Sequence, residues 1–242
     1  MIITSVQNEK IKEIKKLMND KSLAFLDNPK LITEAYDAGH EVLYIIKSEL
    51  YEGKTDYGGS IIEVSKNVFK SISSTENSQG LIGVVKFNKR QLLMPSGNFL
   101  VMDEIQDPGN AGTLIRSALG ANFVDIYMLN SVKTTNEKLV RASMGAIFKT
   151  RVYEITKQEF ISNFKNWNKD LYVCDMNGKS IYDEPLPNGI GIVVGNEGNG
   201  VSSELRNIAK YSIKIPMHNG LESLNAGVSG SIIMYQIENN KN

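Results

Sequence analysis

The sequence predicts an α/β protein, with a small N-terminal α/β domain and a larger C-terminal α/β domain built on a parallel sheet. In the second half of the chain, short apolar runs alternate with helix-like stretches, which is typical of a largely parallel sheet covered by helices on both faces. A polar, turn-prone segment at residues 88–98 precedes this half. We therefore expect two domains, at residues 1–92 and 98–242.

The C-terminal domain should place its site at one edge of the sheet. Ligands of parallel sheets bind at the carboxyl ends of the strands, so the loops that follow the strands are the candidates. Helices are expected at 111–119, at 202–209 and from 226 onwards. The expected strands are Phe99–Asp103, Val124–Leu129, Leu171–Met176, Ile190–Val194 and Ser212–Met217.

The N-terminal domain should begin with an amphipathic helix. Apolar side chains from Ile11 to Met18 share one stripe, while Lys12, Lys15 and Lys16 lie on its flanks and outer face. Such lysines form either an ordinary solvated surface or a face that contacts phosphates. The other expected elements are a helix from Pro29 that is capped by Gly39, strands at 42–46, 61–64 and 81–87, and a short helix at 67–72.

Composition sets the broad class. The 242 residues include 27 Lys and Arg and 27 Asp and Glu, so a nucleic-acid partner must be met by a local basic surface. A single cysteine, Cys174, excludes an intramolecular disulfide and is expected to be a buried thiol in a reducing compartment. No apolar run approaches the roughly 20 residues of a membrane span, and the N-terminus lacks an apolar signal core. We expect a cytoplasmic protein with no membrane partner.

The first candidate loop ends in Asp107-Pro-Gly-Asn110 and leads into a helix. Asp-Pro-Gly is a strong turn signal, and Asn110 is of a residue type that favours the cap of the following helix. On that helix Arg116 lies about 130° from the centre of the apolar stripe, counting 100° per residue. Arg116 should point away from the core, either as a surface charge or as a catalytic group.

The second candidate loop, Gly195-Asn-Glu-Gly-Asn-Gly200, follows an apolar strand. Three glycines let the backbone bend sharply and let a ligand approach closely. The loop lacks the Lys-Ser/Thr ending of a P-loop and the spacing of the dinucleotide fingerprint, so it is not a phosphate cradle. It is either a plain strand-to-helix turn or a site in which Glu197 orients a neighbour or a ligand.

The third candidate loop runs from Ile215 to Asn225 and leads into a helix that begins with small residues. Ser223 and Asn225 can donate and accept hydrogen bonds near the start of that helix, although Ser223 could simply be a cap. His218 is the one imidazole near this site, and loop histidines are commonly solvated.

Four carboxylates raise the question of a metal. No His or Cys joins them at ligand spacing, and the turn already uses one of them, so we expect no metal. The four residues are Asp103, Glu104, Asp107 and Glu197.

Together the three loops resemble, in the same order, the three motifs of the SpoU (TrmH) family of RNA ribose 2′-O-methyltransferases in the SPOUT superfamily. The resemblance covers residues 98–242. The N-terminal half is similar to the substrate-binding domain of ribosomal RNA members, through Thr4-Ser5 with Asn8 and Ile11-Lys12, and through Ser73-Ser74-Thr75-Glu76 with Gln79-Gly80. It departs from that pattern at Leu23–Pro29, where relatives carry an Arg-rich helix end followed by a Glu-Gly pair.

The resemblance implies methyl transfer from S-adenosylmethionine to a ribose 2′-hydroxyl of RNA, here 23S ribosomal RNA. It also implies a deep C-terminal trefoil knot and a homodimer formed through the C-terminal helix, residues 226–238. The implied catalytic residues are Arg116, Asn110, Glu197, Ser223 and Asn225. The implied cofactor-binding residues are Gly195, Asn196, Gly198, Ile215, Met217, Leu224 and Asn225, and the implied RNA-binding residues are Lys12, Lys15, Lys16 and Arg116.

The resemblance leaves two roles open for Arg116. It could act as a general base, or it could clamp a phosphate and stabilise the developing oxyanion. A guanidinium with a pKa above about 12 rarely gives up its proton, which favours the second role.

Three alternatives stand beside this function. A transfer RNA ribose methyltransferase is disfavoured by the extra N-terminal domain. A non-catalytic RNA-binding or ribosome assembly factor would not need Asn110, Arg116, Glu197 and Asn225 together. A nucleotide-binding metabolic enzyme is disfavoured because the phosphate motifs are missing.

Overall fold

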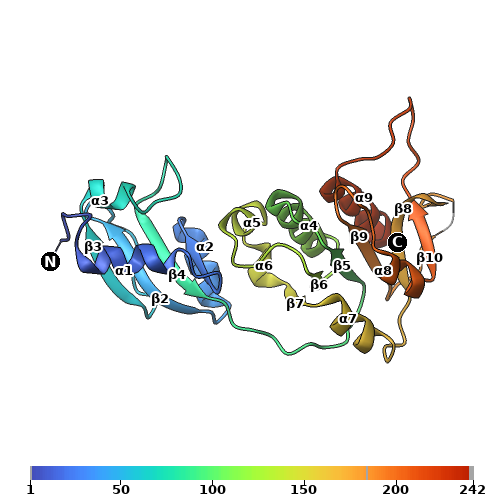
Figure 1. Cartoon of the computed structure of the whole chain (residues 1–242), viewed down its shortest axis with the longest axis horizontal. Helices are drawn as coiled ribbons and strands as arrows, with labels where there is room; N and C mark the ends of the chain where they lie inside the picture. The colour runs from blue at the N-terminus through green and yellow to red at the C-terminus, as the bar shows by residue number, and fades with distance from the viewer. Residues whose placement is uncertain (1, 184, 240–242) are drawn as a thin grey trace. The chain divides into compact units, whose positions relative to one another are not determined.

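The chain folds into two α/β units (Figure 1). This computed structural model describes residues 2–183 and 185–239. Residues 2–89 with 135–137 form the first unit, and residues 90–134 with 138–239 form the second. The outer ends of the two predicted domains, residue 1 and residues 240–242, lie outside the described residues, as does residue 184.

The first unit contains a four-stranded sheet of order β1-β4-β2-β3. Strand β4 (Leu81–Lys86) is antiparallel to β1 (Leu23–Leu26) and β2 (Glu41–Ser48), whereas β2 is parallel to β3 (Ser60–Val64). Every residue of β1 is buried. The sequence did not predict β1, because a run of only four apolar residues is too short to be told from a segment of a buried helix.

Three helices complete the first unit: α1 (Glu9–Leu17), α2 (Pro29–Asp37) and α3 (Lys66–Lys70). The predicted start of α2 at Pro29 is confirmed, and Gly39 takes the left-handed conformation with φ of +81° just past its end. Helix α1 buries Ile11 and Ile14 completely in the apolar core of the unit.

The second unit is a six-stranded sheet of order β10-β8-β9-β5-β6-β7, and all its strand pairs are parallel, as predicted. β7, whose alternation is interrupted by charged residues, was not predicted. The last strand was predicted to end at Met217, but β10 ends three residues earlier, at Lys214. Pro216 has no amide hydrogen with which to continue the hydrogen bonds between strands. The strands are β5 (Phe99–Asp103), β6 (Asp125–Leu129), β7 (Arg151–Ile155), β8 (Leu171–Ser180), β9 (Gly191–Gly195) and β10 (Tyr211–Lys214).

Helices cover both faces of this sheet. Aromatic side chains of α7, among them Phe160 and Phe164, pack with Phe99 and Tyr127 on one face. On the other face α4 and α9 lie side by side against β5 and β9 (Figure 1). The helices are α4 (Pro108–Gly120), α5 (Glu137–Ala142), α6 (Ala146–Lys149), α7 (Lys157–Phe164), α8 (Ser203–Ile208) and α9 (Ala226–Asn239).

The pairing of β8 with β10 is interrupted where β8 carries Cys174. Val173 lies opposite Ser212, but the next residue of β10, Ile213, lies opposite Lys179. Cys174 is only partly buried as a residue, so the expectation of a buried thiol holds for its sulfur but not for the whole residue. Burial of its sulfur still raises the pKa of the thiol to about 12. The thiol is therefore protonated at neutral pH.

No helix within residues 2–183 and 185–239 is both long and apolar enough to cross a membrane.

Close packing of α9 makes a prediction about Gly230. A β-carbon at this position would lie 2.4 Å from Leu114 Cδ2 and 3.0 Å from Val194 Cγ2. Gly230→Val should therefore lower the free energy of unfolding of the second unit by about 2 kcal/mol. Urea unfolding followed by the fluorescence of Trp167, the single tryptophan, measures the change.

The matched control is Gly97→Ala, because no atom lies within 4 Å of a β-carbon built at Gly97. It should shift stability by less than about 0.5 kcal/mol. Equal urea midpoints for Gly230→Val and the unchanged protein would contradict the packing described for α9.

Candidate functional site

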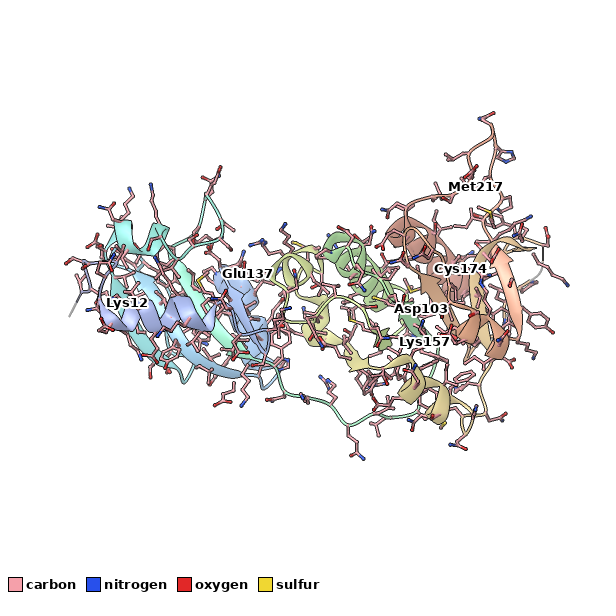
Figure 2. The ribbon with its side chains drawn as sticks, in the orientation of Figure 1. Lys12, Asp103, Glu137, Lys157, Cys174 and Met217 are labelled. Atoms are coloured by element: carbon pink, nitrogen blue, oxygen red, sulfur yellow. The ribbon has the colours of Figure 1, made fainter. Side chains whose placement is uncertain are left out.

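Three loops at the carboxyl edge of the second sheet form the candidate site. They follow β5, β9 and β10, and they lead into α4, α8 and α9 respectively. The third loop carries Met217, which Figure 2 labels partway along an extended segment. Hydrogen bonds join one residue from each loop.

The start of α4 brings Asn110 into the site. Asp107 caps the helix, and its Oδ1 accepts a hydrogen bond from the backbone N–H of Asn110 at 2.7 Å. The expectation that Asn110 is the cap is therefore wrong. Pro108 occupies the first helical turn, which sets the cap one residue earlier at Asp107. This frees the Asn110 side chain, which is 9% exposed, to turn towards the other loops.

A chain of three polar side chains connects the loops. Asn110 Nδ2 donates to Glu197 Oε1 at 2.9 Å, and Asn225 Nδ2 donates to Asn110 Oδ1 at 2.8 Å. Asn225 Oδ1 in turn accepts from the backbone N–H of Val228 at 3.2 Å and so caps α9. Both polar ends of the Asn110 amide are used, so its orientation is fixed.

The glycine loop is a closed turn that displays Glu197. Gly200 N donates to Asn196 O at 2.9 Å, and Asn196 Oδ1 accepts from the backbone N–H of Gly198 at 2.9 Å. A β-carbon at Gly195 would lie 2.2 Å from the carbonyl carbon of Gly200, so only glycine fits there. The turn leaves Glu197 exposed apart from its contact with Asn110.

The remaining predicted site residues are not joined to this network. Arg116 lies on the exposed face of α4, as predicted, and no described residue forms an ion pair or hydrogen bond with its guanidinium. Ser223 is exposed, and its hydroxyl has no hydrogen-bond partner among the described residues. Ile215, Met217 and Leu224 are apolar but only partly buried.

At the end of β5 lies a buried charged residue, Lys157, that the sequence analysis did not predict as part of the site. Lys157, the first residue of α7, is 5% exposed. Its Nζ lies 3.2 Å from Asp103 Oδ1 and 2.9 Å from Glu104 Oε1. Glu104 also has a left-handed backbone with φ of 58°. The signal in the sequence is weak, since a lysine at the start of a helix is ordinarily a surface residue.

Metal ligands are not grouped in the described part of the chain. No cluster of three or more His, Cys, Asp or Glu side chains occurs there that could hold an ion. Asp103 and Glu104, two of the carboxylates considered for a metal, are instead paired with Lys157.

In the first unit, the predicted basic face of α1 is partly neutralised. Lys12 Nζ lies 2.9 Å from Glu9 Oε1, whereas Lys16 is exposed and Lys15 is partly exposed near the end of the helix. The segment Leu23–Pro29, which departs from the family pattern, contains β1 and also has a defined contact: Asp27 Oδ2 accepts a hydrogen bond from Thr75 Oγ1 at 2.9 Å.

Asp27 accepts two further hydroxyl hydrogen bonds, from Ser73 and Ser78. Its single carboxylate thus binds Ser73 and Thr75, which belong to the stretch that resembles the substrate-binding domain, together with the neighbouring Ser78.

Solved structures define the class of protein. The fold matches that of an AdoMet-bound rRNA methyltransferase from Sinorhizobium meliloti with a TM-score of 0.86, at 22% identity and over 99% of this chain and 97% of that one. A crystal structure of an RNA 2′-O ribose methyltransferase matches with a TM-score of 0.83, at 25% identity and over 100% and 99% of the two chains. The fold is that of RNA methyltransferases.

The chain belongs to the SpoU rRNA methylase family, whose model matches residues 97–235. This confirms the family that the three loops suggested. A model of the MRM3-like substrate binding domain matches residues 8–83.

Two curated relatives have named activities. The 23S rRNA (guanosine(2553)-2′-O)-methyltransferase RlmP of Bacillus subtilis is 26% identical over 97% of this chain and 98% of its own length. The 23S rRNA (adenosine(1067)-2′-O)-methyltransferase of Streptomyces laurentii is 29% identical over 72% of this chain and 66% of its own length.

The hydrogen-bonded chain predicts a pH-dependent variant. Asn110→Asp would set a second carboxylate against Glu197, and both this charge and burial would raise the pKa of the new carboxyl group. The destabilisation should be absent below the pKa of an unfolded Asp, about 3.9, and should grow as the pH rises through the raised folded-state pKa. We expect a loss of about 1–2 kcal/mol at neutral pH that is largely regained at about pH 4.

Urea unfolding at the two pH values, relative to the unchanged protein, measures this loss. Asn110→Ala is the control, because it removes both hydrogen bonds without adding a charge and should cost the same at both pH values. A pH-independent cost for Asn110→Asp would rule out its contact with Glu197.

Proposed function

We propose that the protein transfers a methyl group from S-adenosylmethionine to a ribose 2′-hydroxyl of 23S ribosomal RNA. The observation that carries this proposal is the hydrogen-bonded chain Glu197–Asn110–Asn225, which unites the three loops that resemble the family motifs. RlmP, which aligns along nearly its whole length, is named for this reaction on 23S rRNA.

The N-terminal unit supports ribosomal RNA as the substrate class. Residues 8–83 match a model that is described as a substrate binding domain. We assign residues 1–92 to RNA binding and residues 98–242 to methyl transfer. A transfer RNA substrate is the second candidate for the same chemistry, and a non-catalytic RNA-binding role is the third.

The residues present fit S-adenosylmethionine. Gly195, Asn196 and Gly198 offer exposed or half-exposed backbone, while Ile215, Met217 and Leu224 are apolar side chains left partly uncovered. Polar backbone groups and an apolar wall suit a nucleoside with an aliphatic tail. When bound, S-adenosylmethionine supplies a methyl group on a positively charged sulfur.

The protein has to position the ribose and stabilise charge on its oxygen. Asn110 and Glu197 hold each other in place, and the exposed Glu197 carboxylate is free to accept a hydrogen bond from the ribose. We assign Ser223 and Asn225, on the third loop, to the same site, as the resemblance implies. Arg116 is exposed and unpaired among the described residues, so its guanidinium can contact an RNA phosphate and the developing oxyanion.

A trefoil knot and a homodimer belong to the same proposal. The knot is supported by the strand order: the chain runs out to the edge strand β10 and then returns as α9 to pack on α4 and β9. The homodimer is supported by Val228 and Tyr235 of α9, two large apolar residues that are 44% and 52% exposed. We propose the cytoplasm as the location.

The proposed function is tested with labelled S-adenosylmethionine and total RNA that lacks the modification. A 2′-O-methyl group removes the hydroxyl that attacks the phosphate, so methylated positions resist alkaline cleavage. Protection in 23S rRNA is the expected result, and protection in transfer RNA alone would favour the second candidate. Absence of protection, together with normal cofactor binding, would favour the non-catalytic role.

Arg116 generates a separate prediction. Arg116→Ala should lower the rate of methyl transfer by about 10²-fold or more, because removing a group that stabilises an oxyanion costs about that much. Binding of S-adenosylmethionine, measured by calorimetry, should change little. Arg116→Lys keeps the positive charge and should retain part of the rate. Full activity of Arg116→Ala would exclude the proposed role.

The basic face of α1 is tested by salt dependence. Replacing Lys12, Lys15 and Lys16 by Ala should weaken RNA binding and reduce the slope of log K against log salt by about two, since up to three phosphate contacts are lost. The triple Arg variant keeps the charges and should keep the slope. A slope unchanged by the Ala variant would mean that α1 presents an ordinary solvated face.

A further inference from the structure

The buried ion cluster under the glycine loop has no part in the roles proposed above. Lys157 is 5% exposed and Asp103 is 1% exposed, and Figure 2 labels the two side chains close to each other. Lys157 Nζ lies 3.2 Å from Asp103 Oδ1 and 2.9 Å from Glu104 Oε1. The ammonium group of Lys157 thus forms ion pairs with two consecutive carboxylates, those of Asp103 and Glu104, at the end of β5.

The same two residues hold the glycine loop at both of its ends. Glu104 O accepts a hydrogen bond from Asn196 Nδ2 at 2.9 Å, where the loop begins. Asp103 Oδ2 accepts one from the backbone N–H of Ser202 at 2.7 Å, where the loop ends and α8 starts. Glu197 lies between these two points, so its position depends on both contacts.

The cluster of Lys157, Asp103 and Glu104 needs a cation because the carboxylate of Asp103 is almost completely buried. A buried carboxylate that loses its only counter-ion is strongly destabilising, and it responds by taking up a proton or by moving towards water. Burial alone would lower the pKa of Lys157, but hydrogen bonds and charge from Glu104 and Asp103 outweigh it and raise that pKa. Lys157 therefore stays charged at neutral pH.

We infer that Lys157 is a positioning residue for methyl transfer: its charge keeps Asp103 and Glu104 in the arrangement that fixes the glycine loop at both ends. The inference rests on the proposed function, in which this loop holds S-adenosylmethionine and presents Glu197. Lys157 lies under the loop and acts through Asp103 and Glu104.

The test compares S-adenosylmethionine binding by Lys157→Met and by the full-length unchanged protein, using calorimetry without RNA. At about pH 8 the variant should bind about tenfold more weakly, because Asp103 is left charged and unpaired. At about pH 6 its affinity should approach that of the unchanged protein, since a protonated Asp103 needs no counter-ion and can still accept from Ser202 N.

The other charged groups facing this cluster are Glu104 and, on α8, Glu204. Both lie close enough to Lys157 to feel its loss. Their remaining negative charge favours protonation of Asp103 in the variant, so they strengthen the expected pH dependence.

Lys133→Met is the matched control, because Lys133 forms an exposed ion pair with Glu154 at 3.1 Å and does not contact the loop. It should bind like the unchanged protein at both pH values. The fluorescence of Trp167, which packs against Phe160 and Phe164 of α7, shows whether each variant keeps its fold. Lys157→Gln serves as the second variant if Lys157→Met does not fold.

If Lys157→Met binds S-adenosylmethionine as tightly as the unchanged protein at both pH values, the inference is overturned. An equally weak affinity of the variant at both pH values would also overturn it, because that result describes a merely structural loss. Failure of the unchanged protein to bind S-adenosylmethionine would instead overturn the proposed function, and this inference with it.

Discussion

The amide of Asn110 is the contact on which the site depends. It joins residues that are 87 and 115 positions away in the sequence, and it uses both of its polar ends to do so. Such a contact forms only when the parallel sheet brings the ends of its strands to one edge. Because Asn110 is nearly buried, leaving either end unsatisfied costs free energy, so the three loops stabilise one another.

Much of the fold could be predicted from sequence, for reasons that particular elements make clear. Central strands such as β5 and β9 are buried on both faces, and their unbroken apolar runs identify them. Strand β7 was missed because its Arg151 and Glu154 have partners in the folded protein, an ion pair with Asp125 and one with Lys133. A pattern of single residues does not reveal pairs that form across a sheet.

The site was predictable only where residue type and loop position coincide. Glycines at 195, 198 and 200 and the turn at Asp107 are visible in the sequence, whereas the choice between Asp107 and Asn110 as the cap depends on where, within three residues, the helix begins. Lys157 could not be found in this way. It lies more than fifty residues beyond its carboxylate partners, and its burial depends on α7 packing beside the end of β5.

Glu104 shows how the site and the stability of the chain make opposing demands. Its left-handed backbone, with φ of 58°, is one that glycine or asparagine adopts more easily. A substitution to either would relax the backbone but would also remove the carboxylate that faces Lys157. Selection for a more stable protein and selection for an ordered loop therefore favour different residues at the same position, which is a local trade-off between stability and activity.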